Sequence, residues 1–102
     1  MSKYGLRPEA KRDLAGIDDY GTAEWGEDAS AHYLRAIGQA LERYASAPAL
    51  GSDQSQYYPG LRKAIVEQHH AYYLTVSGGI DVVRILHPAM DARGRLKVSL
   101  TQ

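Results

Sequence analysis

Hydrophobic residues recur at helical spacing in the first half of the chain. Residues 8–25 place Leu14, Ile17 and Trp25 on one side, and Pro8 stands where a helix accepts proline in its first turn. Residues 29–47 carry a clearer stripe at spacings of three and four, made of Tyr33, Leu34, Ile37, Leu41 and Tyr44. Gly26 should end the first helix and Pro48 the second, so the pattern predicts a helical hairpin.

The second half of the chain has the pattern of strands. After a polar loop over 49–60, strands are expected over 61–67, 70–77 and 80–87, with a tight turn at Gly78-Gly79. Residues 80–87 are apolar on both faces and should lie inside the sheet. A short strand over 3–7 precedes the helices. The order β-α-α-β-β-β predicts an α+β fold: an N-terminal strand, a helical hairpin and an antiparallel three-stranded meander.

The length predicts one domain over 1–102, with a core over 1–91 and a basic C-terminal tail over 92–102. The tail has no clear period, although Leu96, Val98 and Leu100 alternate and would allow a final edge strand. Two helices can cover only one face of the sheet. We therefore expect apolar and aromatic side chains to be exposed on the other face, or in a groove beside the hairpin, where a partner would bind.

Composition narrows the class of protein. The chain has no cysteine, which excludes disulfides and thiolate sites. It has no apolar run as long as a membrane span and no N-terminal signal peptide, so we expect a cytoplasmic protein. Zero net charge argues against a general nucleic-acid binder. Charge is uneven, however: residues 8–47 have four basic and eight acidic residues, and residues 60–102 have six basic and three acidic residues, which indicates a face for an acidic partner.

Four short motifs, spread over residues 4–91, resemble those of the ParE toxin family within the ParE/RelE superfamily. They occur in the order found in that family, and together they are more specific than any one alone. In chain order the motifs are Tyr4-x-Leu6-x-Pro8-Glu9-Ala10; Trp25-Gly26-Glu27 with Tyr33-Leu34; Pro59-Gly60-Leu61-Arg62; and Val83-Arg84-Ile85-Leu86-His87 with Met90-Asp91.

The resemblance implies the same fold and a function in a type II toxin–antitoxin system. It implies a ParD-like antitoxin whose disordered C-terminal segment folds along the toxin, so the chain should form a hetero-oligomer. Where the target of a ParE toxin is known it is DNA gyrase, which the toxin inhibits by binding. We accordingly expect no cofactor, no metal, no membrane contact and no sequence-specific binding of nucleic acid.

Two groups of residues are candidates for binding. Arg84 lies within an apolar strand, so it must pair with a carboxylate, either Asp91 or one from a helix, or contact a partner. The full set of candidate contacts to the antitoxin or the target is Arg62, Arg84, His87, Met90 and Asp91. The candidate aromatic residues of a groove are Trp25, Tyr72 and Tyr73.

Two other functions stay open. A RelE-like ribosome-dependent mRNA endoribonuclease would need basic residues with a Tyr or His near the C-terminus. No Tyr follows Tyr73, and Arg84 and His87 should point to opposite sides of their strand, so no catalytic residue is assigned. Likewise, His69 and His70 are adjacent and cannot easily share a metal ion. The third possibility is an inactive toxin homologue retained for complex assembly.

Overall fold

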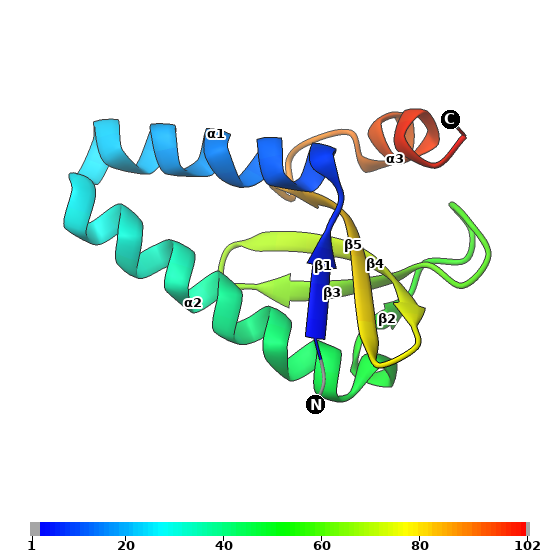
Figure 1. Ribbon diagram of the computed structural model, residues 1–102. Helices are drawn as coiled ribbons and strands as arrows, with labels where there is room; N and C mark the ends of the chain where they lie inside the picture. Colours follow the sequence, from blue (N-terminus) through cyan, green and yellow to red (C-terminus); the bar gives the residue numbers. More distant parts are fainter. Residues whose placement is uncertain (1–2, 102) are drawn as a thin grey trace.

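The computed structural model describes residues 3–101 and has the α+β order expected from the sequence (Figure 1). The elements are β1 (Lys3–Leu6), α1 (Pro8–Trp25), α2 (Glu27–Ser46), a 3-10 turn η1 (Pro48–Leu50), β2 (Ser52–Asp53), β3 (Arg62–Val66), β4 (His69–Val76), β5 (Gly79–Leu86) and α3 (Ala92–Leu100). No helix within residues 3–101 is long and apolar enough to cross a membrane.

The strands form one sheet in the order β1-β5-β4-β3-β2. β5 pairs in parallel with β1 and antiparallel with β4, so the strand that is apolar on both faces does lie inside the sheet. β2 was expected to be loop. Its two residues, Ser52 and Asp53, pair with Lys63 and Arg62, and their polar side chains carry no alternating pattern that could have revealed them.

A bulge interrupts the pairing of β4 with β5. Tyr72 is opposite Arg84 and Tyr73 is opposite Val82, so Val83 has no partner. The extra residue shifts the alternation of side chains by one position. As a result Ile85, and not Arg84, joins Val82 in the core beneath the hairpin. The guanidinium of Arg84 is thereby free to reach a helix.

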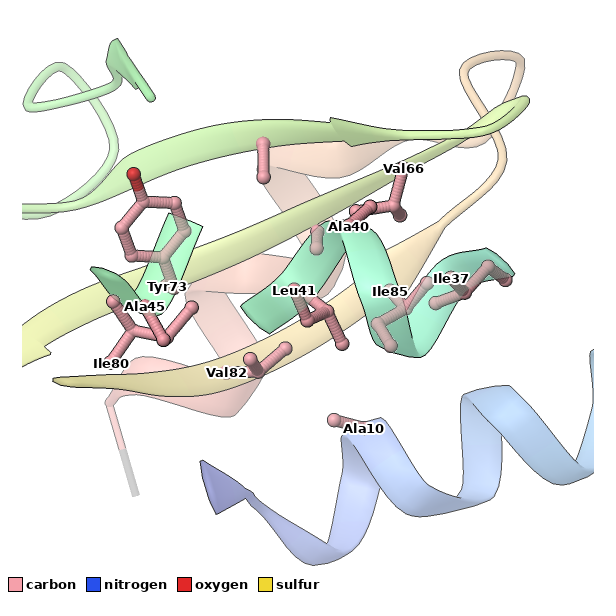
Figure 2. Packing of buried hydrophobic residues seen from close by; sticks show 12 residues of the cluster. Ala10, Ile37, Ala40, Leu41, Ala45, Val66, Tyr73, Ile80, Val82 and Ile85 are labelled. Atoms are coloured by element: carbon pink, nitrogen blue, oxygen red, sulfur yellow. The ribbon is translucent and has the colours of Figure 1, made fainter. Parts of the chain in front are cut away.

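The hairpin covers one face of the sheet. The two helices join at Gly26, whose φ of 93° is accessible to glycine at little energetic cost. Ile37 and Leu41 of α2 are fully buried, and each stabilises the fold by about 1.5–3 kcal/mol. Figure 2 shows them packed with the residues of the first core, which also include Ala10, Ala40, Ala45, Val66, Tyr73, Ile80, Val82 and Ile85.

The C-terminal segment corrects our expectation of a tail with an edge strand. Residues 92–100 form α3, which packs on the opposite face of the sheet and buries Leu96 completely. The alternation of Leu96, Val98 and Leu100 does not distinguish a strand from a helix here. Leu96 and Leu100 are also four residues apart, which places them on one face of a helix. The second core consists of Leu61, Tyr72, Val83, Leu86 and Leu96. This face of the sheet is therefore less exposed than the sequence predicted.

An ion pair holds α1 against β5. The carboxylate of Asp13 accepts hydrogen bonds from Nε and Nη2 of Arg84, both at 2.8 Å, and from the backbone N–H of Ile85 at 2.9 Å. Arg84 also donates to Ser99 of α3 at 3.4 Å, and the Ser99 hydroxyl donates to Glu9 at 3.1 Å. The pair is mostly buried and bidentate, the geometry in which such bonds are strongest. This network connects α1 and α3 to β5.

We predict that Leu96→Ala lowers the free energy of unfolding by about 2–5 kcal/mol, because it leaves a cavity in the second core. Urea denaturation measures the change. Val98→Ala is the matched control, because Val98 is on the same helix but 55% exposed, and it should change stability by less than about 0.5 kcal/mol. Equal effects of the two substitutions would mean that α3 does not pack on the sheet as described.

We predict that Asp13→Leu or Arg84→Met alone destabilises the fold by about 3 kcal/mol, because each leaves its partner charged and largely buried. The double variant should lose clearly less than the sum, as measured by a double-mutant cycle in urea. Arg7→Met is the control: the Arg7–Asp81 pair is about one-third exposed, so its loss should cost less than about 1 kcal/mol. Additive effects at positions 13 and 84 would contradict the coupling.

Candidate functional site

An open pocket of about 550 Å³ lies between the hairpin and the end of the sheet where β4 begins and β5 ends. In Figure 1 the closed end of the hairpin projects beyond the strands, so the outer half of α1 has no sheet beneath it. The pocket uses this unsupported side of α1 as one wall. Its lining residues are Arg12, Asp13, Gly16, Ile17, Tyr20, Trp25, Tyr33, Gln68, His69, Ile85, His87 and Met90.

Aromatic rings form a continuous row along the pocket. Tyr20 and Trp25 meet edge to face with their ring centroids 5.8 Å apart, and Trp25 is 6.2 Å from Tyr33. Tyr33 and His69 are 5.7 Å apart, as are His69 and His87. Tyr20 is 61% exposed and Trp25 is 55% exposed. Large aromatic residues exposed beside a pocket are typical of surfaces that bind another protein.

The imidazole of His69 is held by Tyr33. The Tyr33 hydroxyl accepts a hydrogen bond from the backbone N–H of Gln68 at 3.1 Å and lies 2.7 Å from Nδ1 of His69. Burial, with the neighbouring His87 and His70 adding to it, lowers the pKa of His69 below its usual value. Burial likewise raises the pKa of Tyr33. The pocket therefore contains a neutral imidazole and a neutral phenol at neutral pH.

Three of the residues singled out from the sequence line the pocket, namely Trp25, His87 and Met90. Three others hold the fold together. Arg84 pairs with Asp13, the helix carboxylate alternative, and not with Asp91. Asp91 caps α3 by accepting from the N–H of Gly94 at 3.3 Å. Arg62 donates to the carbonyl oxygen of Gly51 at 2.7 Å.

Tyr72 and Tyr73 do not line a groove, and that expectation is corrected. Tyr73 is fully buried in the first core, where its hydroxyl donates to the carbonyl of Pro48 and accepts from the N–H of Gly51. Tyr72 is 5% exposed and belongs to the second core. Adjacent strand residues point to opposite faces, and here each face has a core that takes one of the rings.

Several pocket residues were not singled out from the sequence. Tyr33 was interpreted only as part of the apolar stripe of α2, and His69 only as half of a histidine pair. Arg12, Gly16 and Tyr20 were not among the candidate residues, although they lie four residues apart and so share one face of α1. That spacing was the signal available in the sequence. Only the tertiary structure shows that the sheet does not extend beneath this face of α1.

The chemistry available in the pocket favours binding over hydrolysis. The two imidazoles could in principle exchange protons with a substrate. Cleavage of a phosphodiester would also need positive charge at the phosphate, and Asp13 neutralises Arg84. Arg12 is then the one basic side chain of the lining apart from the imidazoles. Within residues 3–101, no three His, Cys, Asp or Glu side chains converge as a metal ion would require.

We predict that stability falls as the pH decreases from about 7.5 to 5.5. Folding lowers the pKa of His69 from its usual value of 6.5, so the unfolded chain takes up the proton first as the pH falls, which favours unfolding. His69→Gln should flatten this dependence, as measured by urea denaturation at each pH. His32→Gln is the control, because His32 is exposed on α2. A slope unchanged by His69→Gln would refute the role given to this imidazole.

Comparison with known proteins agrees with the fold and with the motifs. Residues 4–92 match the family model described as the ParE toxin of the type II toxin–antitoxin system parDE. The chain is 40% identical over 91 residues to Toxin ParE1 of Mycobacterium tuberculosis (strain ATCC 25618 / H37Rv), covering 88% of this chain and 93% of that relative. It is 37% identical over 97 residues to Toxin ParE of Escherichia coli, covering 94% of each chain.

A solved structure of the "Chromosomal ParDE TA system from P. aeruginosa" has the same fold, with a TM-score of 0.71. It covers 85% of this chain and 96% of that chain at 19% identity, so it supports the fold alone. The family match spans the two helices of the hairpin and all of the sheet except the first residue of β1, and two relatives from different organisms exceed 30% identity over nearly their full lengths. This chain belongs to the ParE toxin family of type II toxin–antitoxin systems.

Proposed function

We propose that a ParD-like antitoxin neutralises this toxin in the cytoplasm and that the free toxin inhibits DNA gyrase by binding, without chemistry of its own. The observation that carries the proposal is the pocket, in which aromatic groups are exposed while the carboxylate of Asp13, on its wall, neutralises Arg84 of the adjacent strand. An exposed row of rings serves association with a protein. An arginine already held by a bidentate carboxylate is poorly placed to bind a phosphate.

The antitoxin is the partner that the exposed surface favours. A ParE toxin acts within a toxin–antitoxin pair, and both the matching family and the solved P. aeruginosa structure are described as belonging to such a system. Covering Tyr20, Trp25 and Met90, each more than 40% exposed, would remove apolar surface from water and stabilise a complex. Of the candidate residues, His87, Met90 and Trp25 are the ones that line the pocket and are therefore placed for this role.

Gyrase is the target that the family resemblance implies, and the charge of the chain is compatible with a protein target. Its twelve basic and twelve acidic residues balance, whereas proteins that act on nucleic acid usually carry a basic excess. The His69–His87 pair is the observation that favours the alternative, a ribosome-dependent ribonuclease. Stoichiometry separates these two functions, because an enzyme acts below one molecule per target and an inhibitor that works by occupancy does not.

We predict that expression of the chain alone arrests bacterial growth and that co-expression with the protein encoded beside it relieves the arrest. Purified toxin should inhibit supercoiling by gyrase and reach full inhibition only near one toxin per gyrase subunit. It should leave the messenger RNA of a translating extract intact. Leu86→Asp is the inactive control, because it places an unpaired charge in the second core and should prevent folding.

Each contrary outcome has its own meaning. Cleavage of messenger RNA at substoichiometric toxin would replace the proposal with the ribonuclease. Growth arrest without inhibition of supercoiling or cleavage of RNA would remove gyrase as the target. A folded chain that neither arrests growth nor inhibits gyrase would identify an inactive homologue.

A further inference from the structure

Gly16 has no structural reason to be glycine. It lies within α1, where glycine destabilises a helix relative to alanine, and a Cβ atom built on it would meet nothing within 4 Å. Gly21 on the same helix is different, because its Cβ would lie 2.7 Å from the Ser30 hydroxyl oxygen where α1 crosses α2. Packing within the chain therefore explains Gly21 and leaves Gly16 unexplained.

The surroundings of Gly16 point to contact with another molecule. Gly16 lines the pocket, with Arg12 about one helical turn before it and Tyr20 about one turn after it. The missing side chain leaves a notch between an arginine and an aromatic ring. A partner that packs across the notch can approach the backbone of α1 more closely than any side chain there would allow.

Charge defines the chemistry of that partner. Arg12 is exposed and makes no ion pair with any residue between 3 and 101, whereas the carboxylate of Asp13 is used by Arg84. The uncompensated charge on the wall of the pocket is therefore positive, and it matches a carboxylate. A second copy of the chain docking hairpin to hairpin is disfavoured. Residues 13–34 contain six acidic residues and no Lys or Arg, so the two hairpins would repel.

We propose that a segment of the antitoxin packs across Gly16, with an apolar side chain in the notch between Arg12 and Tyr20 and a carboxylate on Arg12. The proposal rests on the proposed function for the identity of the partner, and it adds where on α1 that partner sits and what it must carry. Trp25 and Met90 border the same pocket and would be covered with it. Gly16 is then a binding residue. It destabilises α1 relative to alanine, and the close contact that it permits in the complex is the reason for glycine at this position.

The test uses the full-length toxin and, as the probe, the purified protein whose co-expression relieves growth arrest. The chain has a single tryptophan, so 5-fluorotryptophan places one ¹⁹F signal at Trp25, in the pocket. Titration with the probe should move this signal. Gly16→Leu should weaken binding at least about tenfold, because bulk is added to a close contact. Gly16→Ala should also weaken binding while raising the thermal midpoint by about 2–5 °C, because alanine favours the helix.

Two neighbouring positions supply the controls. Ala15→Leu places the same side chain at an exposed position outside the pocket and should bind as the wild type does. Arg12→Gln should weaken binding and reduce its dependence on salt, whereas Lys11→Gln, which removes an exposed charge outside the pocket, should not. The rise in melting temperature of Gly16→Ala distinguishes a lost contact from a damaged fold.

The possible outcomes distinguish failure of this docking site from failure of the proposed function. Wild-type affinity of a folded Gly16→Leu variant overturns the docking site. So does a probe that relieves growth arrest without moving the Trp25 signal, and either result leaves the toxin assignment intact. A Trp25 signal that shifts with the concentration of toxin alone would assign the surface to a second copy. Absence of growth arrest and of any neutralising protein would contradict the proposed function itself.

Discussion

The hairpin depends on one bidentate contact between Asp13 and Arg84. The Asp13 carboxylate oxygens accept from the guanidinium of Arg84 and from the backbone N–H of Ile85 in β5, so the first turns of α1 are held to β5 in a defined orientation. Farther along, α1 packs on α2, and Ile17 packs against the first core. Asp13 itself forms part of the wall of the pocket.

The same contact explains why a charged residue is tolerated inside an apolar strand. The unpaired Val83 shifts the alternation of β5, so that Ile85 enters the first core and Arg84 reaches Asp13 and Ser99. Bulges often redirect side chains in this way near functional sites. Here the redirection joins α1 and α3 to one strand from opposite faces of the sheet. The pairing with Asp13 also neutralises the charge of Arg84.

The surface beside this framework leaves apolar groups in water and carries a residue that weakens a helix. Tyr20 and Trp25 are exposed along the pocket, and the helix that forms its wall contains Gly16, which destabilises it relative to alanine. Stability comes instead from two cores, one on each face of the sheet. Residues that sustain the fold and residues that we propose to meet a partner are thus largely separate, even where they are neighbours, as Asp13 and Arg12 are.

The sequence by itself determined the two helices of the hairpin, the four longer strands and the α+β class, because periods of 3.6 and 2 are local properties that follow from which face is buried. It also carried the family motifs. Only the tertiary structure decided that residues 92–100 form a helix on the second face, that Arg84 meets Asp13, 71 positions away in sequence, and that Tyr33, His69 and His87 share a pocket. Those contacts depend on the bulge and on the point where the sheet ends beneath the hairpin. No local pattern encodes either, because both are set by how distant segments pack together.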